Sequence, residues 1–128
     1  MSVSIPNGPV DISDPNRTNK YRNKETFYKG IIFDSAKECA RFIELEKFEE
    51  EGLIKSLECQ YPLTVVINNK KMFSLVVDFR YYHNQLGDYV YEDVKPYIKK
   101  HKKFMTTPLF NLKRKIVEAT LGVEITLV

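Results

Sequence analysis

Three runs of apolar and β-branched residues, joined by short polar stretches, constrain the fold of this chain more than any other feature. They span residues 57–67, 72–82 and 89–94. Asn68-Asn69 separates the first run from the second and suits a tight hairpin turn. A polar stretch around Gly87 separates the second run from the third. The sequence therefore predicts three consecutive strands that pair as hairpins.

A helix is predicted before the first run. The side chain of Ser35 is a good N-cap, and Glu38 follows three residues later, at the spacing of a capping box. Apolar residues at helical spacing, among them Phe42 and Leu45, continue until a polar run that ends at Gly52. We expect this helix to begin after Ser35 and to end near Gly52.

A second helix is predicted after the third run. Thr107 and Pro108 are the residue types expected at an N-cap and in a first turn, and Gly122 is the type expected just beyond a helix end. An apolar strand over residues 123–128 follows. The apolar stripe of this helix is predicted to consist of Leu109, Leu112, Ile116 and Ala119.

The predicted order of elements is helix, three strands, helix, strand. Strands that follow one another and are flanked by helices predict a mixed α/β (α+β) domain with a central mixed sheet. The 128 residues suffice for one such domain. We expect a flexible basic arm over residues 1–26, where no hydrophobic period is visible, and a folded domain over residues 27–128.

Basic residues are unevenly distributed, although the formal net charge is only +3. No acidic residue lies between Asp93 and Glu118, a stretch that holds eight lysines and arginines. A one-sided positive charge suits the phosphates of DNA, whereas an isolated lysine run is also common on a merely solvated surface. The candidate DNA contacts are Arg17, Lys20, Arg22 and Lys24 in the arm, and Lys99, Lys100, Lys102 and Lys103 in a loop after the third run.

Carboxylates near two of the predicted strands form a candidate metal site. Asp78 lies within an apolar run, where an ion is costly to bury without a cation or a donor. Strand alternation places Asp93 and Lys95 on one face, and the hairpin brings them close to Asp78. Together with the carbonyl of Val94, the two carboxylates offer the oxygen ligands that Mg²⁺ or Mn²⁺ prefers.

A metal at this place would polarise a scissile phosphate and activate a water molecule. Lys95 would orient that water, help to take its proton, or stabilise charge in the transition state. Glu38 is a further candidate because it shares the core side of its helix with Phe42 and Leu45. It holds a metal-bound water or a second ion, caps the helix, or does both. The alternative for Asp78, Asp93 and Lys95 is a structural ion pair on the sheet.

The order Asp78, then Asp93-Val94-Lys95, after a helix that bears Glu38, resembles the core of the PD-(D/E)XK nucleases, whose usual order is αβββαβ. Over roughly residues 20–128 the chain more closely resembles a family of small phage-encoded PD-(D/E)XK endonucleases, some of them assigned as Holliday-junction resolvases. The stretches that carry this resemblance are KYRNKET (20–26), GIIFDSAKECARF (30–42), LECQYPL (57–63), VVDFRY (76–81) and YEDVKP (91–96).

The resemblance implies a role for each matching residue. Asp78 and Asp93 would be metal ligands, Lys95 the catalytic lysine and Glu38 the helix carboxylate. Gln60 lies in the strand where many relatives carry a polar residue near the site, and is a candidate DNA contact. The chain departs from the family at two positions, because Pro96 stands where relatives often have glycine and Val77 stands where the family name has its proline.

The function that we expect is a Mg²⁺- or Mn²⁺-dependent endodeoxyribonuclease that acts as a homodimer on DNA, with branched DNA as one expected substrate. One alternative is a non-catalytic DNA-binding or interaction protein on the same fold. Another is the subunit of a restriction-type or transposition-type endonuclease. No run approaches the ~20 apolar residues that span a bilayer, so we expect a cytoplasmic protein without membrane contact, in the bacterial host if it is phage-encoded.

Overall fold

The structure, a computed structural model, describes residues 10–11 and 24–128. Most of the predicted arm over residues 1–26 lies outside them, and so do the candidate DNA contacts Arg17, Lys20 and Arg22. The chain forms two compact units, one that ends at Lys47 and one that runs from Phe48 to Val128.

The first unit contains a small antiparallel sheet and most of a helix. The strands are β1 (Val10–Asp11), β2 (Thr26–Tyr28) and β3 (Ile31–Phe33), in the order β1-β2-β3. The helix is α1 (Ala36–Glu50). The hydroxyl of Ser35 accepts a hydrogen bond from the backbone N–H of Glu38 at 3.1 Å, which confirms the predicted N-cap. Phe42 packs on the unit's small sheet through Phe33, with ring centroids 5.3 Å apart.

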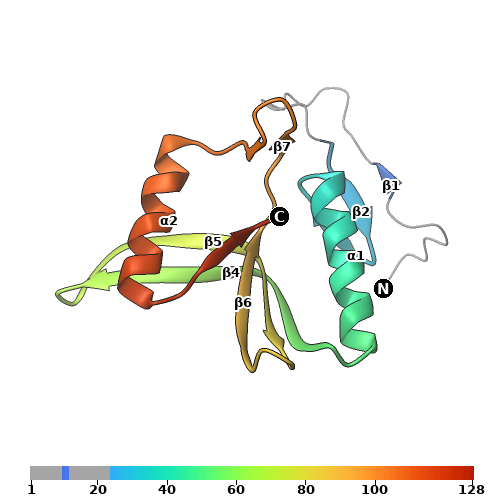
Figure 1. The fold of residues 1–128 in the computed structure, drawn as a ribbon, viewed down its shortest axis with the longest axis horizontal. Coiled ribbons are helices and arrows are strands. Elements are labelled where there is room, and N and C mark those ends of the chain that lie inside the picture. The colour runs from blue at the N-terminus through green and yellow to red at the C-terminus, as the bar shows by residue number, and fades with distance from the viewer. Residues whose placement is uncertain (1–9, 12–23) are drawn as a thin grey trace. The chain divides into compact units, whose positions relative to one another are not determined.

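The second unit is built on a mixed four-stranded sheet (Figure 1). Its strands are β4 (Ile54–Ile67), β5 (Lys70–His83), β6 (Asp88–Asp93) and β9 (Ile125–Leu127). The first three pair antiparallel in the order β4-β5-β6, as the hairpin turns predict, and β9 pairs parallel to β6. The chain is therefore a mixed α/β protein with a mixed sheet, as predicted from the order of its elements.

The stretch predicted as a lysine-rich loop forms a small β-hairpin instead. Its strands are β7 (Tyr97–Ile98) and β8 (Lys103–Phe104), and the N–H of Met105 closes its base on the carbonyl of Pro96 at 2.7 Å. Lys102 completes the turn with a φ of 50°, a conformation that glycine and asparagine adopt most readily. The sequence gives no sign of this turn because a lysine occupies the position.

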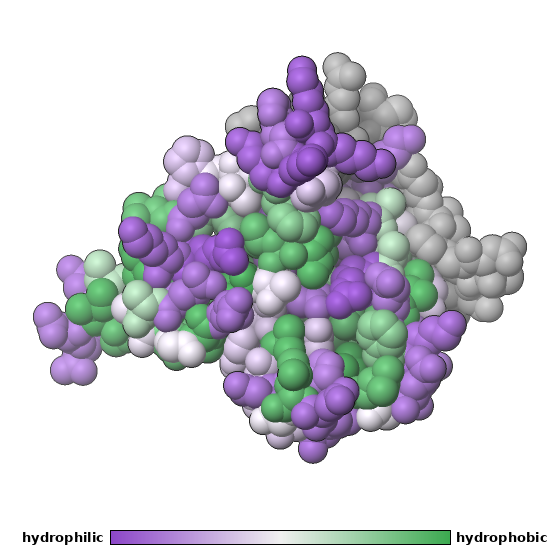
Figure 2. Space-filling model, viewed as in Figure 1, coloured by the Kyte–Doolittle hydropathy of each residue, from purple (hydrophilic) through white to green (hydrophobic). Residues whose placement is uncertain are grey.

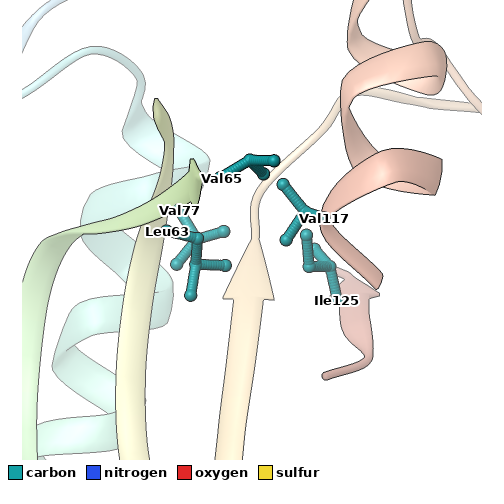
Figure 3. Packing of buried hydrophobic residues seen from close by; sticks show 5 residues of the cluster. All are labelled: Leu63, Val65, Val77, Val117 and Ile125. Carbon is teal, nitrogen blue, oxygen red and sulfur yellow. The ribbon is translucent and has the colours of Figure 1, made fainter. Parts of the chain in front are cut away.

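Helix α2 (Pro108–Leu121) packs against β4 and β5. The hydroxyl of Thr107 accepts the N–H of Phe110 at 3.1 Å, and Gly122 ends the helix with a φ of 66°, as predicted for both positions. Apolar side chains from three strands and α2 fill the space between them, and Figure 3 shows how they gather there. The fully or almost fully buried members are Leu63, Val65, Val77, Val117 and Ile125.

The predicted apolar stripe of α2 is wrong at Leu109, Leu112 and Ala119, which are exposed, and is confirmed only at Ile116, which is partly buried against the core. Leu109 is 60% exposed and Leu112 is 55% exposed, whereas Val117 is fully buried. The helix is turned so that Arg114 and Glu118, on the same face as Val117, meet the outer edge of β9. There Glu118 Oε2 accepts the backbone N–H of Ile125 at 2.8 Å, and Arg114 Nη2 donates to its carbonyl at 2.6 Å.

This rotation follows from the cost of leaving backbone groups without partners at a sheet edge. The N–H and the carbonyl of Ile125 on β9 both bond to side chains of α2, so the helix faces the edge with two charged side chains. Their positions, with Val117 between them, decide which side of α2 is buried. In residues 24–128, neither helix combines the length and hydropathy needed to cross a membrane.

A pair of substitutions on α2 tests its orientation. Val117→Ala is expected to lower the free energy of unfolding by about 2 kcal/mol, because it removes two methyl groups from a filled core. Leu112→Ala removes more apolar atoms but from an exposed position, so its effect is expected to stay within about 0.5 kcal/mol. Urea denaturation followed by circular dichroism measures both. Equal losses, or a larger loss for Leu112→Ala, would show that the predicted stripe faces the core after all.

Candidate active site

Asp78 and Asp93 lie beside each other where β6 ends against β5. The last ladder pair between these strands is Phe79 with Glu92, so the next positions are Asp78 and Asp93. The N–H of Asp78 donates to Asp93 Oδ1 at 3.3 Å, and the N–H of Val94 donates to Asp78 Oδ2 at 2.7 Å. The carboxylate of Asp93 thus accepts an N–H from β5, and the carboxylate of Asp78 accepts an N–H from the residue that follows β6. We call this arrangement the aspartate exchange.

Lys95 lies next to Asp93 on the same side of the chain. Its Nζ is 3.0 Å from Asp93 Oδ2 and 4.1 Å from the centroid of the Phe110 ring, which α2 supplies. Asp93 is only 4% exposed. The ring face and the carboxylate both attract the ammonium group, so its position is fixed from two sides.

Val94 presents its carbonyl on the side of β5. The N–H of Val128 donates to the carbonyl of Asp93, and the N–H of Lys95 donates to the carbonyl of Val128, both at 3.0 Å. These bonds keep the chain extended from Asp93 to Lys95. In an extended residue the N–H and the carbonyl point to the same side. Since the N–H of Val94 meets Asp78, its carbonyl is directed toward Asp78 as well.

Glu92 does not belong to this group of carboxylates. It is 2% exposed, and its Oε2 accepts the hydroxyl of Tyr81 at 2.5 Å. Alternation along β6 turns it away from Asp93, which bonds to Asp78 and Lys95. The neighbouring acids Glu92 and Asp93 therefore have different surroundings, and Asp93 is the one that lies beside Asp78.

Gln60 contacts the aspartate exchange from β4. The ladder pairs on either side of it, Cys59 with Phe79 and Tyr61 with Val77, place it opposite Asp78. Its Nε2 donates to Asp78 Oδ1 at 3.3 Å. Gln60 has a φ of 53° in the middle of a strand, a left-handed conformation that costs a residue with a Cβ about 1–2 kcal/mol. Such strain is most common at functional sites.

Burial, and after it the neighbouring carboxylate of Asp93, raise the pKa of Asp78 to about 7, although the N–H of Val94 and the amide of Gln60 act in the opposite direction. A negative charge at Asp78 is therefore costly in the absence of a cation. The two aspartates share one place in the sheet, and one ammonium group, that of Lys95, lies against them.

The donor set fits a hard divalent cation. Asp78 and Asp93 supply carboxylate oxygens, Val94 supplies a carbonyl, and oxygen ligands of this kind are those that Mg²⁺ binds together with water. Each carboxylate oxygen that accepts one hydrogen bond keeps a second lone pair for a further partner. In the described part of the chain no group of three or more His, Cys, Asp or Glu side chains is arranged to hold a metal ion.

Glu38, the fourth predicted site residue, lies in the first unit, whereas Asp78, Asp93, Val94 and Lys95 lie in the second. Glu38 lies in the first turn of α1 and is 6% exposed. Its role as the helix carboxylate stays a prediction.

The candidate DNA contacts that the structure describes are all at the surface or beside the site. Lys24 is exposed in the first unit. Four exposed lysines lie on the β7–β8 hairpin, which begins two residues after Lys95, and Figure 2 shows the hydrophilic surface that this hairpin forms. These four are Lys99, Lys100, Lys102 and Lys103.

Phe110 and Val128 are two contributors that the sequence did not indicate. Phe110 lies fifteen positions beyond Lys95 on a helix, and Val128 acts through its backbone alone. No spacing rule links either of them to the D-x-K pattern. An apolar residue in the first turn of a helix packed on the strand ends would have been the one available signal for Phe110.

Residues 18–125 match the model of a protein family described as "Protein of unknown function (DUF1064)", and the chain belongs to this family. No curated protein matches the chain, and neither does any solved structure.

Asp78→Asn is expected to stabilise the metal-free protein at about pH 8 and to have little effect at about pH 4. A carboxyl whose pKa is raised on folding binds its proton more tightly in the folded state, so its contribution to stability falls as the pH rises from about 4 to about 7. Asparagine keeps an oxygen for the N–H of Val94 and carries no charge. Thermal unfolding in EDTA measures the effect, with the exposed-site variant Asp88→Asn as the control. A midpoint below that of the unmodified protein at about pH 8 would contradict the raised pKa.

Two substitutions at Gln60 measure the backbone strain separately from the amide. Gln60→Gly is expected to be more stable than Gln60→Ala by about 1 kcal/mol, because both lose the amide and only alanine keeps the strained Cβ. The matched pair Thr64→Gly and Thr64→Ala, at a regular position of the same strand, is expected to show the reverse order. Chemical denaturation of the four variants gives the comparison. The same order at both positions would rule out strain at Gln60.

Proposed function

We propose that this DUF1064 chain is a Mg²⁺- or Mn²⁺-dependent endodeoxyribonuclease that hydrolyses phosphodiester bonds. The observation that carries the proposal is the aspartate exchange with Lys95 beside it. Two carboxylates from paired strands are fixed by backbone hydrogen bonds of 3.3 and 2.7 Å, and an ammonium group lies 3.0 Å from one of them. A nuclease that uses a metal and a lysine needs this combination of groups at one point.

The arrangement of the longer elements supports the proposal. The two helices and the strands of the four-stranded sheet follow one another as α1, β4, β5, β6, α2 and β9. This is the αβββαβ order expected for a PD-(D/E)XK core. Asp78 lies on the second strand of that series, and Asp93 and Lys95 lie at the end of the third. These are the places where the resemblance puts the metal ligands and the lysine.

Each residue has a distinct task in this proposal. Asp78, Asp93 and the carbonyl of Val94 would hold the cation, which when bound supplies Lewis-acid polarisation of the phosphate and a water of lowered pKa. An ammonium group has three N–H donors. One N–H of Lys95 is directed at Asp93, and another would donate to a phosphate oxygen as negative charge develops there. The amide of Gln60 keeps the carboxylate of Asp78 in place.

The lysines of the β7–β8 hairpin would bind the DNA backbone next to the cut. They are exposed, and the hairpin that carries them begins two residues after Lys95. The hydrogen bond between Met105 and Pro96 fixes the base of the hairpin. Phosphate contacts of this kind position a duplex without reading its sequence. The resemblance implies that Glu38 is the helix carboxylate of such an enzyme, and the distribution of charge in the sequence makes Lys24 and the basic residues of the arm further candidate DNA contacts.

The finer assignment follows from the resemblance alone. It names branched DNA, such as a Holliday junction, as the substrate and a homodimer as the active form, because symmetric cuts across a junction need two active sites. A bacterial host's cytoplasm is the compartment in which a phage-encoded enzyme of this kind would act.

A second candidate function is supported by the same hydrogen bonds. All four carboxylate oxygens of Asp78 and Asp93 have a donor within the protein, from Gln60, Val94, Asp78 and Lys95. The group could therefore serve only to join β5 to β6 in a DNA-binding protein without catalysis. Such a protein would bind DNA in a salt-dependent way and would be indifferent to Mg²⁺.

Cleavage assays with matched variants decide between the two. The unmodified protein is expected to cut at least one of linear duplex, flap, Y-fork and four-way junction DNA when Mg²⁺ or Mn²⁺ is present. Asp93→Ala and Lys95→Ala are each expected to slow cleavage by about 100-fold or more, because each removes a group that acts on the transition state. Asp88→Asn, at the exposed start of the same strand, is expected to cut normally.

The binding of the same DNAs is measured in parallel by fluorescence anisotropy. Lys95→Ala is expected to keep most of its affinity while it loses cleavage. The endonuclease proposal fails if the unmodified protein cuts none of the four DNAs with either metal, or if Asp93→Ala cuts as fast as the unmodified protein does.

A further inference from the structure

The β7–β8 hairpin carries an aromatic ring among its lysines. Tyr97 is 48% exposed. It pairs with Phe104 across the hairpin, and the two ring centroids are 5.1 Å apart at an interplanar angle of 70°. An edge-to-face contact of this kind holds a ring in a fixed orientation. Tyr97 is therefore a flat, supported ring that remains open to solvent on a hydrophilic hairpin.

Four lysines lie on the same short segment as this ring. Lys99, Lys100 and Lys102 form the turn, and Lys103 belongs to β8, in register with Ile98. Positive charge that tracks a backbone, combined with an aromatic face on which bases stack, is the combination that proteins use to bind single-stranded nucleic acid. A hairpin that contacted only the phosphates of a duplex would need the lysines but not the ring.

The ring is close to the proposed site of cleavage. Tyr97 follows Lys95 by two residues, and two extended residues span at most about 7 Å. Adjacent nucleotides in one strand of a duplex are about 3.4 Å apart along the axis. A base on Tyr97 would thus belong to a nucleotide within a few steps of the phosphate that Lys95 contacts. Pro96, which has a fixed φ, and its bond to Met105 restrict how far the hairpin moves relative to Lys95.

We propose that Tyr97 stacks on an unpaired base beside the scissile phosphate, so that the substrate is DNA with a single-stranded stretch or a branch next to the cut. In a continuous duplex both faces of every internal base are covered by its neighbours, and the ring would have no base to stack on. A fork, gap or flap offers such a base. The position of the cut rests on the proposed nuclease function, whereas the stacking contact does not.

Binding measurements without cleavage test the contact. The unmodified protein is titrated in EDTA against a Y-fork that carries 2-aminopurine at the first unpaired position, and against a continuous duplex of the same length. Stacking on Tyr97 is expected to quench the 2-aminopurine fluorescence. Tyr97→Ala is expected to abolish the quenching and to weaken binding to the fork by about 5- to 150-fold, which corresponds to the loss of one stacked base, while binding to the duplex stays unchanged.

Three further variants serve as controls. Tyr97→Phe keeps the aromatic face and is expected to behave as the unmodified protein does. Tyr97→Leu keeps apolar packing against Phe104 without an aromatic face, and is expected to behave like Tyr97→Ala, which separates stacking from a collapse of the hairpin. Leu86→Ala removes a still more exposed apolar side chain, 69% exposed on the β5–β6 turn, and is expected to have no effect.

The inference is overturned if Tyr97→Ala binds the fork as tightly as the unmodified protein does, or if it loses the same factor on fork and duplex. It is also overturned if Tyr97→Leu retains the quenching. A protein that shows the Tyr97-dependent preference for the fork but cuts nothing with Mg²⁺ or Mn²⁺ would refute the endonuclease function alone. A protein that cuts the fork with Mg²⁺ or Mn²⁺, but binds and cuts it equally well with or without Tyr97, would refute the stacking contact alone.

Discussion

The backbone hydrogen bonds on both sides of β6 are the constraint on which the candidate site depends. On one side the carbonyl of Asp93 accepts the N–H of Val128, and on the other its side chain accepts the N–H of Asp78. The residues from Asp93 to Lys95 are therefore held in an extended conformation between two strands. Side chains placed on a sheet in this way keep their relative positions better than side chains on loops, which is what a catalytic group requires.

The fold and the central part of the site could be read from the sequence because each rests on a local rule. The hairpin turns predict which strands are neighbours, and an aspartate within the apolar run of β5 is unusual enough to stand out. Alternation then places Asp93 and Lys95 together. The contributions of Gln60 and Phe110 could not be read in this way, because one depends on a left-handed φ at a residue type that rarely adopts it and the other on the packing of a distant helix.

The orientation of α2 shows why a hydrophobic pattern alone can mislead. Leu109 and Leu112 have the spacing of a buried stripe and are more than half exposed. Arg114 and Glu118 have to reach the backbone of β9, and this requirement turns the helix away from the orientation that its leucines favour. Sequence periodicity records where apolar residues lie, but it does not record which polar groups of the partner need satisfying.

Arg114 and Glu118 also limit how the sheet can pair with the sheets of other copies of the chain. An outer strand normally presents N–H and carbonyl groups that can recruit a strand from another molecule, and this is a common first step toward fibrils. At Ile125 both groups are already occupied by Glu118 and Arg114. The sheet is thereby protected at this position against growing from one molecule into the next. Copies of this chain that do assemble have to meet by contacts other than the continuation of β9 at this point.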